Sequence, residues 1–106
     1  MTQAQLKTAL DTLGLPVAYR EFTTSPSLPY ICFLIAYSGD FMADNKNAIG
    51  VNNYQVELYS RKKDLINETL LENLFKSLDI PYQKIETYLA TEKMTQVIFL
   101  IQLIGG

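Results

Sequence analysis

The stretch that most restricts the fold of this chain is Met94–Ile104, a run of mainly β-branched, aromatic and other apolar residues (MTQVIFLIQLI). Charged residues precede it and two glycines follow it, and its composition predicts a long β-strand rather than a helix. One alternating set of its side chains is wholly apolar and is expected to face a core: Val97, Phe99, Ile101 and Leu103. This strand therefore anchors a sheet.

The opposite face of the same strand is also mostly apolar. It carries Ile98, Leu100 and Ile104, interrupted by Gln96 and Gln102. A strand with a single buried face should alternate with polar side chains. Each Leu or Ile left in water forgoes roughly 1.5–3 kcal/mol of burial, against a total domain stability of about 5–15 kcal/mol. We therefore expect a second layer, or another subunit, to cover this face.

The rest of the chain predicts two helices and four further strands. Thr2 can cap a first helix that runs through Leu13, where Gly14 and Pro16 stop it. Asp64 can cap a second helix that ends at residues 79–81. Strands are expected over four segments: 17–22, 30–37, 51–60 and 82–90. The 30–37 segment is apolar on both faces, which predicts a position inside the sheet.

This order of elements predicts one domain, residues 1–106, of the α+β class. We expect a two-layer sandwich: a mostly antiparallel sheet of about five strands with both helices on one face. In the second helix, the predicted core-facing stripe is Ile66, Leu70, Leu74 and Leu78, flanked by Leu71 and Phe75. Glu68 and Glu72, one turn apart, are interpreted as part of an exposed polar face.

Composition argues against most chemistry. The chain has no histidine, which removes the commonest general base and metal ligand. It has a single cysteine, Cys32, expected to be buried as a small hydrophobe. The five glycines form no phosphate-binding loop. We expect no enzyme activity, no cofactor and no bound metal.

Charge and hydropathy restrict the partners. A net charge of −2 and a pI near 5.0 give no electrostatic case for nucleic acid. The sequence has no secretory signal and no run of about twenty apolar residues. We therefore expect that the protein contacts no membrane and that it is located in the reducing cytosol. The basic run Arg61–Lys63 is interpreted as solvated rather than as a polyanion contact.

Two further surfaces are candidate interfaces. Residues 38–50 form a long polar segment, too long for an ordinary hairpin connection, and are predicted to be a mobile loop that becomes ordered against a neighbour. Its candidate contact residues are Asp40, Phe41, Met42, Asp44 and Asn45. Its oxygen-rich side chains lack the spacing of an EF-hand. Tyr82 and Tyr88 are expected to be half exposed, as aromatic residues at interfaces often are.

The order of several segments resembles a known family. These are GLPVAY from Gly14, LPYIC from Leu28, the Asp/Asn-rich 38–50 segment, YQVELYSRKKD from Tyr54, a helix with Leu-Phe, YQKIETY from Tyr82 and EKMTQVIF from Glu92. In this order they resemble small tail-completion or tail-terminator (head–tail joining) proteins of long-tailed phages and prophages of Gram-positive bacteria. The resemblance runs from Gly14 to Leu103.

The resemblance implies a structural role. Such proteins form a ring, commonly a hexamer, that ends the tail tube and docks to the capsid connector. The expected partners are copies of the chain, the tail tube protein and the head connector. The expected location is the bacterial cytoplasm during assembly and then the virion. The alternatives are a capsid-side head–tail connector, a small cytosolic ligand-binding module and a small cytosolic α+β enzyme using tyrosines and carboxylates.

Overall fold

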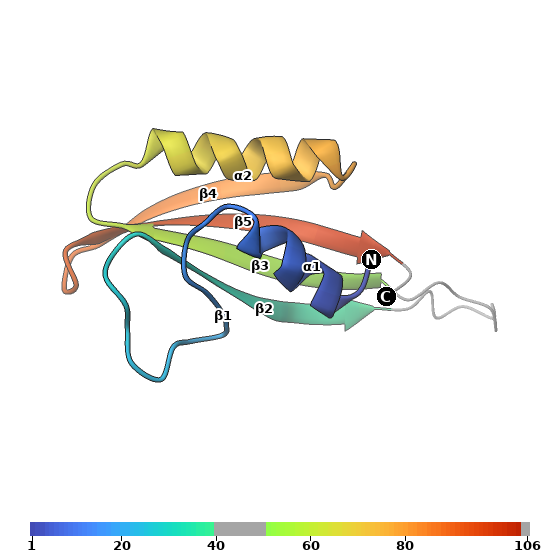
Figure 1. Cartoon of the computed structure of the whole chain (residues 1–106), viewed down its shortest axis with the longest axis horizontal. Coiled ribbons are helices and arrows are strands. Elements are labelled where there is room, and N and C mark those ends of the chain that lie inside the picture. The colour runs from blue at the N-terminus through green and yellow to red at the C-terminus, as the bar shows by residue number, and fades with distance from the viewer. Residues whose placement is uncertain (40–50, 105–106) are drawn as a thin grey trace.

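The computed structural model describes residues 1–39 and 51–104, which form a twisted sheet with two helices (Figure 1). The elements follow in the order α1 (Gln3–Asp11), β1 (Val17–Tyr19), β2 (Tyr30–Gly39), β3 (Val51–Ser60), α2 (Leu65–Ser77), β4 (Tyr82–Leu89) and β5 (Met94–Ile104). The predicted α+β class, with a mostly antiparallel sheet and two helices, is confirmed. The predicted loop residues 40–50 lie outside the described residues.

The sheet has five strands in the order β1-β2-β3-β5-β4. All neighbouring pairs are antiparallel except β1 with β2, which is parallel. The long strands β3 and β5 pair in register from Val51↔Ile104 to Ser60↔Thr95. β2 has a neighbour on each side, as its two apolar faces predicted. The pairing of β2 with β3 shifts by one residue between Ile35 and Tyr37.

Both helices begin with the caps that the sequence predicts. The Thr2 hydroxyl accepts a hydrogen bond from the Gln5 backbone N–H, and the Gln5 side chain accepts one from the Thr2 N–H, which is a complete capping box. Asp64 accepts a bond from the Asn67 N–H at the start of α2. After α1, Gly14 has a positive φ of 82°, a conformation that favours glycine.

The core lies between the helices and one face of the sheet. The two helices contribute Leu6, Leu10, Leu71 and Phe75 to a single buried cluster, so both cover the same face. The sheet side of this cluster comes from alternate positions of three strands: Ile31, Phe33, Tyr54, Val56, Leu58, Val97, Phe99, Ile101 and Leu103. The core-facing set predicted for β5 is therefore confirmed.

The predicted core-facing stripe of α2 is wrong in its first half. Ile66 is 77% exposed and Leu70 is also exposed, whereas Leu74 and Leu78 pack against the core as predicted. The predicted flanking residues Leu71 and Phe75 are fully buried, beside Glu68. Apolar residues occupy more than half the circumference of this helix, so periodicity alone does not fix its rotation. Phe75 packs on Phe99 with ring centroids 5.5 Å apart, and this contact orients the helix.

Four predicted boundaries also need correction. α1 ends at Asp11 rather than Leu13, and β4 ends at Leu89 rather than residue 90. β1 ends at Tyr19 rather than residue 22, because Arg20 has a positive φ of 69° and turns the chain away from β2. Ser38 and Gly39 belong to β2, where they pair with Asn52 and Val51, rather than to the polar loop. The paired part of β2 and β3 is thus longer than their apolar residues alone indicated.

Candidate assembly interface

The face of the sheet opposite the helices is the candidate interface, called the open face. Pairing in register places side chains from β2, β3, β5 and β4 on it in rows. One row consists of Cys32, Glu57, Ile98 and Ile85, and the next of Leu34, Gln55, Leu100 and Gln83. Ile98 and Leu100 are partly exposed, while Ile85 is 48% and Ile104 57% exposed.

The apolar side chains of the open face form two stripes. β4 and β5 provide Ile85, Ile98, Leu100 and Ile104, and β2 provides Cys32 and Leu34. Between the stripes runs the polar row of β3: Asn53, Gln55 and Glu57. Within the described part of the chain, no helix or further sheet covers this face. The expected apolar second face of the last strand therefore exists as a surface.

A hydrogen-bond chain crosses the middle of the open face. Gln96 Nε2 donates to Tyr59 Oη over 3.0 Å, and Tyr59 Oη donates to Glu57 Oε1 over 2.9 Å. Burial raises the pKa of Glu57, and the bond from Tyr59 opposes that rise only in part. Burial and the neighbouring Glu57 carboxylate raise the pKa of Tyr59. The surroundings of Glu57 and Tyr59 are thus partly desolvated even in the isolated chain.

Cys32 is buried in the open face, as the sequence predicted. Burial, with nearby carboxylates, raises the pKa of its thiol to about 11. A thiol with a raised pKa is protonated at neutral pH and is a weak nucleophile. Beside it, Tyr30 packs between Phe22 and Tyr59, with ring centroids 5.3 and 5.2 Å away.

Tyr82 and Tyr88 lie on the other side of the sheet, away from the open face. Tyr82 pairs with Ile101 and packs against Phe75 and Phe99 on the helix-covered side. Its hydroxyl donates to Glu72 over 2.9 Å. Tyr88 is on the same side and is 61% exposed. The structure therefore brings Ile98, Leu100 and Ile104 together but separates the tyrosines from them.

An ion cluster joins α2 to β4, which the sequence interpretation missed. It consists of Lys63, Glu68, Glu72, Lys84 and Glu86. Lys84 Nζ lies 2.6 Å from Glu68 Oε1 and 2.9 Å from Glu72 Oε2. Lys63 contacts Glu68 Oε2 at 2.8 Å and also pairs with Glu86.

Glu68 is fully buried in this cluster, so the prediction that it lies on an exposed face is wrong. Burial on its own would raise the pKa of Glu68, but hydrogen bonds from Lys63 and Lys84 outweigh it and lower the pKa. Hydrogen bonds to Glu68 and Glu72 raise the pKa of Lys84. The available signal was the alternation of charge on β4 (Lys84, Glu86), which a solvated strand also shows. The cluster explains Glu68 and Glu72 as structural residues.

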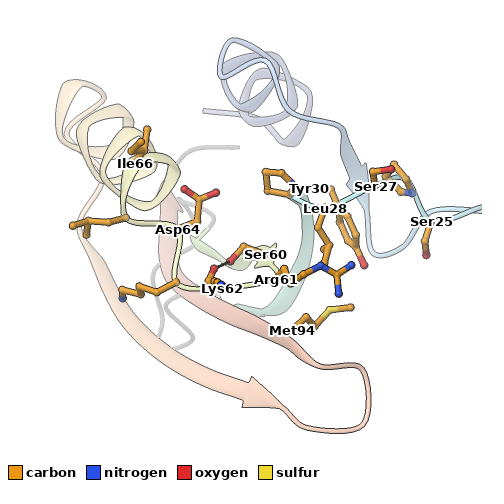
Figure 2. A pocket seen from close by; sticks show the side chains of 14 residues that line it. Ser25, Ser27, Leu28, Tyr30, Ser60, Arg61, Lys62, Asp64, Ile66 and Met94 are labelled. Atoms are coloured by element: carbon orange, nitrogen blue, oxygen red, sulfur yellow. Dashed lines mark hydrogen bonds between the residues drawn. The ribbon is translucent and has the colours of Figure 1, made fainter.

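A pocket of about 790 Å³ opens at the start of α2, called the α2-end pocket (Figure 2). Its walls are the 25–30 segment, the β3–α2 connection, the first turn of α2 and Met94. Figure 2 shows the Arg61 guanidinium directed into the hollow between the 25–30 segment and Met94. Ser60 Oγ donates to the Lys62 carbonyl over 2.6 Å, which fixes the connection.

Other predicted features are only partly visible. Asp40, Phe41, Met42, Asp44 and Asn45 lie outside the described residues, so their grouping with the open face stays a prediction. Over residues 1–39 and 51–104, no cluster of three or more acidic or cysteine side chains has the arrangement to hold a metal ion. Among the helices described, none is long and apolar enough to span a membrane.

Comparison with known proteins gives a shared fold. No protein-family model and no curated protein matches the sequence. Among solved structures, a chain in the virion of a native gene transfer agent particle is similar, with a TM-score of 0.59 and 10% identity. The match covers 99% of this chain and 87% of that chain. The fold therefore occurs nearly complete in a subunit of a virion particle.

Proposed function

We propose that this chain is a structural subunit of a phage or prophage particle that forms a ring at the tail–head junction. The ring ends the tail tube and docks to the capsid connector, and the protein is not an enzyme. The observation that carries the proposal is the open face, whose apolar stripes include Ile98, Leu100 and Ile104. Assembly in the bacterial cytoplasm and a final place in the virion follow from this role.

The energetics of the open face favour a partner. Covering a side chain that is about half exposed, as Ile85 and Ile104 are, gains roughly 1 kcal/mol at about 25 cal/mol per Å² of apolar surface. These two side chains together gain about 2 kcal/mol per subunit, and the less exposed Ile98 and Leu100 add a smaller amount. Contiguous apolar surface of this kind usually marks a contact. A ring repeats the contact in every subunit by a head-to-tail arrangement that closes.

Two likenesses support a virion role. The fold is shared with the subunit of the gene transfer agent virion, across nearly the whole chain. The segment order resembles the tail-completion and tail-terminator family. Neither requires a catalytic group, and the open face holds a neutral thiol and a hydrogen-bonded carboxylate rather than an activated pair. A purely structural subunit accounts for all of these features.

Solution mass tests the proposal. Light scattering after size exclusion, at rising protein concentration, should show a closed oligomer, and the resemblance leads us to expect a hexamer. Leu100→Lys should reduce it to monomer while circular dichroism stays unchanged, because Leu100 is already partly exposed. Leu70→Lys is the matched control, since Leu70 is an exposed apolar residue on α2, away from the open face and from the pocket at the start of that helix. A wild-type chain that stays monomeric, or equal mass in Leu100→Lys and wild type, contradicts the proposal.

The nearest alternative is a connector on the capsid side of the same junction. The two roles present the same ring to different neighbours, so the partner distinguishes them. Copurification of the tagged chain with the tail tube protein supports the tail side. Copurification with the adaptor next to the portal supports the capsid side.

A further inference from the structure

The α2-end pocket has a largely apolar lining, to which the β3–α2 connection adds the cationic residues Arg61 and Lys62. The apolar part consists of Pro26, Leu28, Pro29, Leu65, Ile66 and Met94. Leu65 is 62% exposed and Ile66 is 77% exposed, so both present apolar surface to a ligand. Across residues 1–39 and 51–104, no ion pair involves Arg61 or Lys62. Lys63, by contrast, is held by Glu68 and Glu86.

This combination defines the ligand by its chemistry. Apolar walls favour one or two large hydrophobic side chains, and the two cationic residues favour carboxylates beside them. The Asp64 carboxylate is already used, because it accepts bonds from Asn67 N–H and Nδ2 at the start of α2. The pocket therefore suits an extended segment with an apolar centre and acidic flanks.

The chain itself contains such a segment. Residues 40–44 read Asp-Phe-Met-Ala-Asp, with Phe41 and Met42 between two aspartates. We propose that the α2-end pocket takes Asp40–Asp44 of a neighbouring copy of this chain, with the apolar pair inside and the aspartates at Arg61 and Lys62.

Geometry excludes the same copy as the source. The pocket lies where β2 begins and β3 ends, whereas residues 40–50 connect Gly39 and Val51 at the opposite end of those strands. At about 3.3 Å per residue, ten-residue β2 separates the two ends by roughly 30 Å. A connection anchored at both ends reaches back only about half its contour length, roughly 20 Å for eleven residues. Only another molecule can supply the segment.

The proposal rests on the proposed function only in requiring a second copy. The pocket and the donated segment sit at opposite ends of one molecule, so each subunit gives a segment to one neighbour and receives one from the other. This is a heterologous contact, the kind that closes into a ring when the rotation allows. It adds a second interface to the open face.

Mixed disulfide formation tests the contact directly. One population of the full chain carries Met42→Cys and a second carries Ile66→Cys; after mixing and mild oxidation, the cross-link between the two is mapped by peptide mass spectrometry. The control pair is Met42→Cys with Ser77→Cys, because Ser77 is exposed at the far end of α2. We expect the pocket pair to cross-link at least tenfold faster than the control pair. Equal rates would overturn the proposal.

Charge exchange supplies the second test. Arg61→Glu with Lys62→Glu in the Ile66→Cys population should slow the cross-link at least tenfold. Adding Asp40→Lys with Asp44→Lys to the Met42→Cys population should restore the rate to within about threefold. Arg61 and Lys62 are exposed, so the fold should persist in this population, as circular dichroism can verify. No slowing, or slowing without restoration, would count against the pairing of these charges.

The two proposals fail in different ways. If Leu100→Lys abolishes the oligomer but the pocket pair cross-links no faster than the control, the pocket proposal is refuted and the open-face ring stands. If the pocket pair cross-links as expected while Leu100→Lys leaves the oligomer intact, the segment exchange is supported and the open-face interface is refuted.

Discussion

Removing the Lys84 charge should show how much the ion cluster between α2 and β4 contributes to the free energy of unfolding. Lys84 makes the shorter of the two ion pairs to the fully buried Glu68, at 2.6 Å, and a second ion pair to Glu72 at 2.9 Å. In Lys84→Met the apolar stem is retained and the charge is lost. Glu68 is then left with Lys63, whose side chain is 48% exposed and shared with Glu86.

The magnitude follows from the burial of Glu68. Breaking a buried ion pair by removing one partner costs about 3–5 kcal/mol. Because Lys63 remains and Lys84 is itself 36% exposed, we expect the lower end or less, about 2–3 kcal/mol of unfolding free energy. For a domain of this size, 1 kcal/mol shifts the melting temperature by roughly 4 °C. The expected loss is therefore on the order of 10 °C.

The assay is urea unfolding of Lys84→Met, Glu68→Leu and the double variant, followed by circular dichroism. Replacing both charges with apolar groups removes the unpaired buried carboxylate, so the double variant should be more stable than the sum of the single losses implies. Lys7→Met is the control, because Lys7 pairs with exposed Asp11 on α1, away from the cluster. Losses below about 0.5 kcal/mol in both single variants, or strict additivity, would refute the role assigned to the cluster.

The pH dependence gives an independent check on the same cluster. The pKa of Glu68 is lowered in the folded chain by its lysine partners. A depressed carboxyl pKa contributes stability that is present above the unfolded value, near 4.5, and is lost as pH falls through the folded value. The Glu68→Leu variant should therefore lose less stability than wild type on acidification below about pH 4.5. An identical acid profile would contradict this assignment.

Two further substitutions test the open face and the rotation of α2. Burial raises the pKa of Glu57, so the charged carboxylate destabilises the fold above that raised value. In urea unfolding, the free energy of unfolding of Glu57→Gln relative to wild type should therefore increase between pH 4 and pH 8. A difference that stays constant over this range would contradict the prediction. Phe75→Ala should cost about 3–5 kcal/mol of unfolding free energy, whereas Ile66→Ala should stay within about 0.5 kcal/mol, because Phe75 is buried and Ile66 is 77% exposed. Equal losses in thermal unfolding would show that α2 presents its other stripe to the sheet.

The sequence by itself determined the elements and one face of the sheet. The alternation of side chains predicted the bounds of β3 and β5 and the face on which each of their side chains lies. A one-residue error in a strand would move every side chain to the wrong face, so this signal is strict. Thr2 and Asp64 fixed the starts of the two helices through local hydrogen bonds, and Gly14 marked the turn that follows α1. These signals are local, so they can be seen without knowing the neighbours.

The candidate site was only partly readable for the same reason. The sequence identified Ile98, Leu100 and Ile104 as needing a cover, because their spacing along one strand sets their face. It did not show that β2 and β4 extend this surface with Leu34 and Ile85, since strand order is a non-local property.

Tertiary structure alone decided the rotation of α2 and the role of Glu68. Six apolar residues around α2 leave several stripes of similar hydrophobicity, and the choice depends on Phe75 meeting Phe99 and on Lys84 reaching Glu68. The partners of that carboxylate come from β4 and from the β3–α2 connection, up to 16 residues away. A buried charge is tolerated only where such partners converge, and convergence is a property of the fold rather than of the local sequence.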